Sequence, residues 1–392
     1  MPNDWLSDFV ECFQHGEAPP RVLYWVGVST IAGALGRKVW IDEEIFRWYP
    51  NFYILIVGVP GEAKKSTSSS LGMTMLQEIG VDLGPEISTW QGLITHFADC
   101  AQLVRVGDEE QEMSCVTLEL SEFGTFFDTS DHWLVDVLTR MWDNKPGPLI
   151  KNTKKDGNEV VANPWLNLIA CTTPEWVTDN FRAGLAGTGL ASRMLYIYCD
   201  RSVRDVSYPS RSKIKAPKAL RTDLVNRLKE IVKFNGPVQM TEAAYVWGDN
   251  WYKESKARAR AANSEIERNF FAREQTHLHK LAIVIAASRG RLPVIDVADM
   301  IEADKHLQNL SVDSRRVFNV VGQTNTSKAA LKIIDMLELN GPMHRRDLYR
   351  KGFFRTISIK DFMEALASAL VAGLVQQTGS RDDPIINATK RK

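Results

Sequence analysis

The feature that most constrains the fold is an apolar run, residues 51–59, that breaks at a glycine-rich turn and continues into a helix-compatible segment. Its β-branched residues predict a buried strand. A strand, a glycine-containing loop and a helix start are typical of a phosphate-binding P-loop, because loop N–H groups and the helix N-terminus both face an anion. We expect a nucleotide site formed by Gly58, Pro60, Gly61, Lys64, Lys65, Ser66 and Thr67.

The spacing of this loop departs from the common pattern, in which a glycine directly precedes the lysine and a Ser or Thr follows it. Here Gly58 stands seven positions before Lys65, and Lys64 occupies the place of the last glycine. If Lys64 held the phosphates, Lys65 would stand in the Mg²⁺-ligand position, which a cation cannot fill. We therefore assign Lys65 to the ATP phosphates and the Ser66 hydroxyl to Mg²⁺, with Lys64 as an additional phosphate or backbone contact. The alternative is a buried strand followed by a basic turn.

Length and composition set broad limits. A chain of 392 residues exceeds the size of a single core, so two or three domains are expected. Basic and acidic residues number 48 each, so any nucleic-acid contact must come from a local patch. Without a signal pattern or a membrane-spanning apolar run, we expect a cytoplasmic protein with no membrane partner. Five widely spaced cysteines are expected to be reduced core residues: Cys12, Cys100, Cys115, Cys171 and Cys199.

Hydrophobic periodicity divides the chain into five regions. Residues 1–50, two helices and a short hairpin, are expected to cover a P-loop core formed by residues 51–200. Residues 201–222 are rich in Ser, Pro, Lys and Arg and predict a linker, and residues 223–322 predict a helical domain. Three helices and a two-stranded wing in residues 323–392 predict a winged-helix domain. Its excess of Lys and Arg suits DNA, but such domains also dock proteins, and both readings stay open.

A second apolar strand, residues 114–120, ends in acid and follows an acidic stretch, residues 107–112, that we expect to be a solvated loop. A P-loop ATPase needs such a strand beside the phosphate loop, because one carboxylate orients Mg²⁺ and the next polarises the attacking water. The usual Asp-Glu ending is Ser121-Glu122 here. We expect Glu122 to activate water, with Ser121 or Glu119 assisting Mg²⁺. A simple edge-strand acid is the alternative.

A β-hairpin is predicted over residues 149–161, because Asp156-Gly157 is a strong turn signal between two apolar runs. Lys154 and Lys155 fall at its tip, and Lys151 lies on its first strand. Lysines on a projecting hairpin can bind the phosphates of single-stranded DNA. A solvated surface hairpin is the alternative.

Two further polar groups flank the last predicted strands of the core. Thr172 or Thr173, at the end of strand 165–171, suits a sensor of the γ-phosphate, and we favour Thr173. Arg193 directly precedes strand 194–199 and lies far from its own P-loop, so it is a candidate arginine finger for a neighbouring subunit. It could instead pair with a carboxylate at a domain edge.

This order of motifs is similar to that of superfamily-3-like AAA+ P-loop ATPases. The combination resembles the replicative helicase or helicase-primase proteins of phages and related mobile elements. The motifs that carry the resemblance are Tyr49-Pro50-Asn51, Gly58-Val59-Pro60-Gly61, Lys64-Lys65-Ser66-Thr67, Ser121-Glu122, Asn163-Pro164-Trp165-Leu166-Asn167, Thr172-Thr173-Pro174-Glu175 and Arg193.

The resemblance implies an α/β, AAA+-like core of parallel strands flanked by helices, followed by an all-helical domain and a winged helix. It also implies a hexameric ATPase that translocates on single-stranded DNA in the cytoplasm of a bacterial host cell, with a primase or replication initiator as a further partner. Two alternatives remain. One is a nucleotide-dependent initiator or helicase loader, and the other is a regulatory or defence-system ATPase with a protein substrate.

Overall fold

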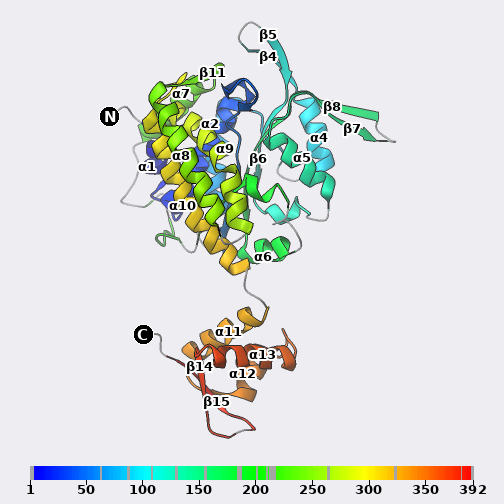
Figure 1. Ribbon diagram of the computed structural model, residues 1–392, viewed down its shortest axis with the longest axis vertical. Coiled ribbons are helices and arrows are strands. Elements are labelled where there is room, and N and C mark those ends of the chain that lie inside the picture. The colour runs from blue at the N-terminus through cyan, green and yellow to red at the C-terminus, as the bar shows by residue number, and fades with distance from the viewer. Residues whose placement is uncertain are drawn as a thin grey trace. The chain divides into compact units, whose positions relative to one another are not determined.

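The computed structural model describes residues 4–61, 64–85, 89–106, 109–128, 131–153, 157–182, 188–199, 202–208, 211, 218–262, 265–321, 325–380 and 382–389. The chain divides into two compact units, Met1–Phe318 and Asn319–Lys392. Both units can be followed in Figure 1. None of the helices in these ranges combines the length and apolarity that a bilayer crossing requires.

The first unit is built on a parallel sheet of β10 (Met194–Cys199), β3 (Tyr53–Gly58), β9 (Trp165–Thr172) and β6 (Cys115–Leu120), hydrogen-bonded in that order. A parallel bridge between Leu83 and Thr117 adds a short segment beside β6. The sheet has helices on both faces, which is why β3 and β9 are buried at every position. The prediction of an α/β fold with a parallel sheet is confirmed.

One face of the sheet carries α1 (Trp5–Phe13), α2 (Pro20–Leu35) and α3 (Lys65–Glu78), whose apolar side chains share a core with Ile54, Ile56 and Ile197. The helices α2 and α3 approach closely because Gly72 leaves room for the Thr30 side chain, which a Cβ would overlap.

The opposite face carries α5 (His132–Trp142), while α4 (Trp90–Asp99) contacts β8 (Gly157–Val161) and α6 (Pro174–Arg182) contacts β3. On this face the Tyr53 hydroxyl donates to the Leu138 carbonyl at 2.8 Å, which ties β3 to α5. In Figure 1, α4 and α5 lie on the opposite side of the unit from α1 and α10.

A second sheet contains β12 (Val294–Ile295), β11 (Gly236–Met240), β1 (Val39–Asp42) and β2 (Arg47–Trp48) in that order. The β1–β2 pair is the hairpin that the sequence predicts before the P-loop strand. The surrounding helices are α7 (Lys218–Ile231), α8 (Glu242–Ala261), α9 (Glu265–Ser288) and α10 (Val297–Val321). Their apolar side chains belong to the same core as those of α1 and α2, and β1 pairs with β11. The two regions predicted as an N-terminal cover and a helical domain therefore share one sheet and one core. Because α7 begins at Lys218, the predicted linker is shorter than expected.

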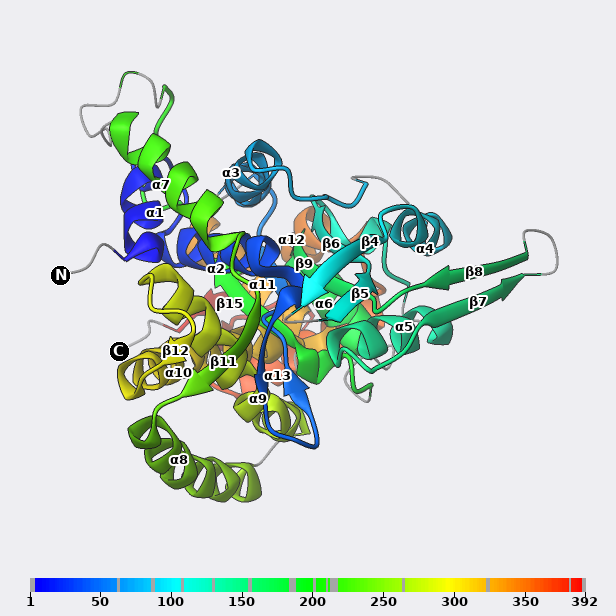
Figure 2. The ribbon, with the colours of Figure 1, turned by 90° about the horizontal axis from the view of Figure 1, so that it is seen from above.

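Two hairpins extend from the first unit, as Figure 2 shows for β7 (Leu149–Thr153) and β8 (Gly157–Val161). This hairpin was predicted, whereas Lys154 and Lys155, which were expected at its tip, lie outside the described residues. The second hairpin is formed by β4 (Gln102–Val106) and β5 (Glu109–Met113). The expectation of a solvated loop was wrong for the acidic residues of β5, because cross-strand pairing with β4 orders them.

The second unit contains α11 (Asn325–Asn340), α12 (Arg345–Gly352), α13 (Ile359–Val371) and an antiparallel sheet of β13 (Met343–His344), β15 (Ile385–Ala388) and β14 (Val375–Thr378). Its own core includes Ile333, Leu348, Phe362 and Ile386. The three predicted helices and the two strands of the wing are confirmed as elements, and β13 adds a third strand.

Candidate nucleotide-binding site

The P-loop candidate connects the end of β3 to the start of α3 at the carboxyl edge of the parallel sheet, where ligands bind in folds of this kind. Gly61 has a φ of 78° and Lys64 a φ of 48°, so the chain turns through two left-handed positions before the helix begins. Glu62 and Ala63 lie outside the described residues. The predicted strand, loop and helix are therefore all present.

Gly58 is required at the end of β3 by close contact. A Cβ at this position would lie 2.5 Å from the Cys199 carbonyl oxygen of neighbouring β10. The Lys65 ammonium donates to the carbonyl oxygens of Gly58 at 2.5 Å and Val59 at 3.1 Å, so its side chain folds back along the loop. The loop thus holds a cation at the helix start, where helix N–H groups also attract an anion.

Lys64 points to a different partner. Its ammonium lies 3.5 Å from a Glu17 carboxylate oxygen in the α1–α2 connection, and its backbone is left-handed directly before α3. Ser66 and Thr67 are exposed in the first turn of α3. Lys64 therefore links the loop to the α1–α2 connection, and Lys65-Ser66 as the functional pair stays a prediction.

Glu119 on β6 reaches the P-loop helix although β9 lies between β6 and β3. Its carboxylate accepts hydrogen bonds from Ser69 and from Ser70, the latter at 3.0 Å. One strand therefore separates β6 from β3, yet the acid on β6 contacts the helix that follows the loop. Sequence reasoning missed both serines, although the hydroxyl run from Ser66 to Ser70 was a visible signal.

Several charged groups lie near the buried thiol of Cys171, close to the end of β9. Burial raises its pKa to about 12, the Lys65 ammonium opposes that rise, and the carboxylates of Glu119 and Glu122 add to it. Ser69 also hydrogen-bonds this thiol. Three predicted site residues from β6, its following turn and α3 therefore lie within electrostatic range of one atom.

The two threonines after β9 have separate contacts. The Thr172 hydroxyl lies 3.5 Å from a Glu122 carboxylate oxygen, whereas the Thr173 hydroxyl accepts from the Trp176 N–H at 3.2 Å at the start of α6. The structure thus places Thr172 nearer the expected water-activating acid. Ser121 is exposed at the end of β6.

Arg193 is buried, with 4% of its surface exposed. Its Nε and Nη2 donate to the two carboxylate oxygens of Asp143 at 2.9 and 2.8 Å, and Nη1 donates to the Gly189 carbonyl at 2.6 Å. An arginine finger needs a free guanidinium at a subunit surface. In this chain Arg193 instead has the contacts of the alternative expectation, a pair with a carboxylate.

The hairpin expected to bind DNA is described only in part. Lys151 lies on β7 opposite Glu159 on β8, and Glu159 accepts from the Thr95 hydroxyl at 2.5 Å. The exposed apolar pair Ile150 and Val160 shares this hairpin.

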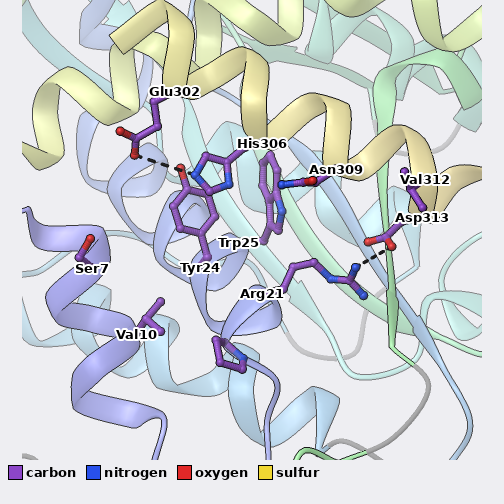
Figure 3. A pocket seen from close by; sticks show the side chains of 11 residues that line it. Ser7, Val10, Arg21, Tyr24, Trp25, Glu302, His306, Asn309, Val312 and Asp313 are labelled. Carbon is purple, nitrogen blue, oxygen red and sulfur yellow. Dashed lines mark hydrogen bonds and ion pairs between the residues drawn. The ribbon is translucent and has the colours of Figure 1, made fainter. Parts of the chain in front are cut away.

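A pocket of about 580 Å³ lies between α1, α2 and α10 (Figure 3). The rings of Tyr24 and His306 stack at 3.9 Å between centroids. Trp25 and the Asn309 amide also line the pocket. Burial and the Lys305 charge lower the His306 pKa to about 4, so this imidazole is neutral at pH 7. Aromatic rings with a few polar groups are usual for a small-molecule site of this volume.

Arg21 connects this pocket to the P-loop edge. Its guanidinium forms an ion pair with Asp313 at 2.7 Å and donates to the Tyr198 carbonyl near the end of β10. The next residue, Cys199, pairs with Gly58 in the sheet register. Sequence reasoning did not identify this pocket, because α2 and α10 are almost 300 positions apart in the chain.

No protein-family model and no curated protein matches this chain. Among the described residues, no group of three or more His, Cys, Asp or Glu side chains is arranged to hold a metal ion.

Proposed function

We propose that the chain is a Mg²⁺-dependent ATPase of the AAA+ type that acts on DNA in replication of a phage or mobile element. The observation that carries this proposal is the convergence of Lys65, Glu119 and Glu122 around the end of β9, beside a P-loop geometry. A cation, two carboxylates and a helix N-terminus at one sheet edge are the groups that phosphoryl transfer requires.

Each residue then has a defined role. Lys65 balances charge on the β- and γ-phosphates, and Glu122 orients and polarises the attacking water. Thr172 hydrogen-bonds Glu122 and replaces Thr173 as the candidate sensor. The Ser66 hydroxyl is the direct Mg²⁺ ligand, and Glu119 acts on that side of the site through Ser69 and Ser70. These oxygen donors fit Mg²⁺, which would neutralise developing phosphate charge.

The pocket beside α2 and α10 suits the base of the same nucleotide. It is connected to the P-loop edge through Arg21 and β10, and it offers rings for stacking and the Asn309 amide for base hydrogen bonds. A purine and its ribose need a cavity of a few hundred Å³. This placement would put the phosphates over α3 and the base against α2.

The topology supports the AAA+ assignment. The acid strand β6, the threonine strand β9 and the last strand β10 follow β3 in the chain, yet β9 and β10 are the spatial neighbours of β3. The order of elements in the second unit supports a winged helix. In this proposal the protein assembles as a ring in the host cytoplasm, the β7–β8 hairpin carries Lys151, Lys154 and Lys155 to single-stranded DNA, and a primase or initiator is a separate chain.

The burial of Arg193 favours a second candidate, a nucleotide-dependent initiator or loader. Such a protein uses ATP to set assembly and does not require rapid hydrolysis by a trans arginine. The two candidates differ in whether DNA accelerates turnover.

Steady-state ATP hydrolysis with and without single-stranded DNA tests the proposal. Lys65→Ala should abolish turnover, because its ammonium is the cation of the loop. The double variant Lys154→Ala/Lys155→Ala should keep basal turnover and lose stimulation by DNA, whereas the control Lys229→Ala/Lys253→Ala, which removes two exposed lysines from α7 and α8, should behave as wild type. Hydrolysis indifferent to DNA and to the hairpin lysines would exclude a translocase and leave the loader. Undiminished hydrolysis by Lys65→Ala would refute the ATP site.

A further inference from the structure

The second unit carries an exposed apolar row along α13. Ile359, Met363 and Val371 are 55%, 39% and 91% exposed, and Ala367 between them is also exposed. These four residues, here called the α13 stripe, recur every four positions and extend over roughly 18 Å at 1.5 Å per residue.

The α13 stripe is separate from the residues of α13 that fold the unit. Phe362, Ala365, Leu366 and Ala369 point into the core and are buried. A helix of this kind normally presents charged or polar residues on its outer face. A continuous apolar row on that face is characteristic of an interaction surface.

The composition of this face opposes DNA recognition by α13. Base edges and phosphates are read by Arg, Lys, Asn, Gln and other donors. The exposed residues of α13 instead include the apolar stripe, Asp361 and Glu364, with Lys360 as the basic residue of the helix. The two carboxylates would be repelled by phosphates.

Positive charge gathers at one end of the stripe. Lys351 is exposed in the last turn of α12, Arg355 is exposed in the connection that leads into α13, and Lys360 is exposed in the first turn of α13. Phe354, in the connection between α12 and α13, is a further exposed apolar side chain, at 67%. Asp361, the residue after Lys360, accepts a hydrogen bond from the capping Ser358 at 2.8 Å.

We propose that the α13 stripe docks an amphipathic helix of a partner protein whose acidic residues lie at the end facing Arg355 and Lys360. The apolar row would supply buried contact area, and the cations would set the orientation of the partner helix. This interaction goes beyond the nucleotide chemistry of the first unit.

A second copy of the chain fits this surface less well. In an antiparallel pairing of two α13 helices, the basic end of one would meet the end near Val371 of the other, where the sequence Val371-Ala372-Gly373-Leu374 has no acid. Glu364 lies near the middle of the row and would approach its own copy. Charge complementarity therefore favours a different, acidic partner.

The test uses the full-length chain without nucleotide, so its outcome does not depend on the proposed ATPase. Two labelled 16-residue helical peptides with the same leucine rows, one with glutamates at one end and one with lysines there, are titrated by fluorescence anisotropy. Wild type should bind the acidic peptide at least tenfold more tightly than the basic one. Met363→Asp and Ala367→Glu should each weaken acidic-peptide binding at least tenfold, and Leu339→Asp, at an 85% exposed site on α11, should not change it.

Circular dichroism of each variant verifies folding. If either Met363→Asp or Ala367→Glu does not fold, the other variant carries the test. Arg355→Glu/Lys360→Glu should reverse the peptide preference. The proposal is overturned if neither peptide binds, if the basic peptide binds better, or if Met363→Asp and Ala367→Glu leave binding unchanged. It is also overturned if Met363→Asp weakens duplex-DNA binding tenfold, because that result assigns the surface to DNA. Self-association in sedimentation that this variant abolishes would likewise overturn it, because the surface would then bind a second copy.

Discussion

Replacing Arg193 by alanine separates a structural role from a catalytic one. The Arg193–Asp143 pair is bidentate, with Arg193 buried and the Asp143 side chain 20% exposed, and the guanidinium also lies 5.5 Å from the centre of the Trp142 ring. Removing one partner of such a pair leaves an uncompensated carboxylate and costs about 3–5 kcal/mol. Asp143 remains within electrostatic range of Arg273 and Lys280. We therefore expect the lower end, about 3 kcal/mol, which is a large part of the stability of a typical domain.

Urea unfolding followed by tryptophan fluorescence measures this loss of unfolding free energy in Arg193→Ala. The matched control, Arg193→Met/Asp143→Leu, removes both charges and should recover most of it, because an apolar pair of similar size needs no desolvation of ions. ATP hydrolysis of Arg193→Ala, normalised to its folded fraction, should stay within about threefold of wild type. An unchanged unfolding free energy combined with a turnover loss of about a thousandfold or more, the usual effect of losing an arginine finger, would refute the structural assignment.

Three further predictions follow from the site and the helical layer. Gly58→Ala should weaken binding of a fluorescent ATP analogue at least tenfold, because the new methyl group would lie 2.5 Å from the Cys199 carbonyl and displace the loop; unchanged affinity would contradict this. Glu119→Gln should raise the Mg²⁺ concentration for half-maximal hydrolysis roughly tenfold, as loss of an outer-shell group does, and an unaltered Mg²⁺ titration would count against its role. Burial lowers the pKa of His277 to about 3 and that of His279 to about 4, from 6.5. Below pH 6.5 the unfolded state therefore binds more protons than the folded state, and the free energy of unfolding falls. At pH 5 this loss is about 2 kcal/mol for each histidine. Thermal unfolding between pH 8 and 5 checks this, and His277→Gln/His279→Gln should flatten the dependence.

Local patterns were sufficient for much of the fold. The apolar run before Gly58 is β3, the Asp-Gly turn marks the β7–β8 hairpin, and helical spacing locates the three helices of the second unit. Each depends on residues close in sequence, so periodicity and turn chemistry specify it. The β4–β5 hairpin was missed because its second strand, Glu109–Met113, is mostly acidic and gains order only by pairing with Gln102–Val106.

Contacts between distant segments were beyond sequence reasoning. The carboxylate of Glu119 accepts hydrogen bonds from Ser69 and Ser70, about 50 positions earlier, and the aromatic pocket is lined by α2 and α10. The residue types were recognisable as polar or aromatic, but their partners depend on which strands are neighbours. The sequence also could not decide between Thr172 and Thr173, because the geometry of the turn determines which hydroxyl lies near Glu122.

Strand direction explains the different roles of the cations in the first unit. Lys65 follows β3 and so lies at the carboxyl edge of the sheet, where ligands bind. Arg193 precedes β10, and Lys280 is bonded to Asn51 ahead of β3, with its Nζ 2.7 Å from the Asn51 Oδ1 and 3.1 Å from the Trp142 carbonyl. Burial lowers the Lys280 pKa well below its usual value.

Both buried cations therefore lie at the amino edge, where they tie α9 and the end of α5 to the strands. This distinction follows from the order of strand and cation in the sequence. An arginine directly before a parallel strand starts at the edge opposite its own P-loop, so it can act on a nucleotide only by projecting from the surface toward another subunit. Arg193 is turned inward to Asp143 instead, so in the proposed ATPase the catalytic groups are those that follow the strands.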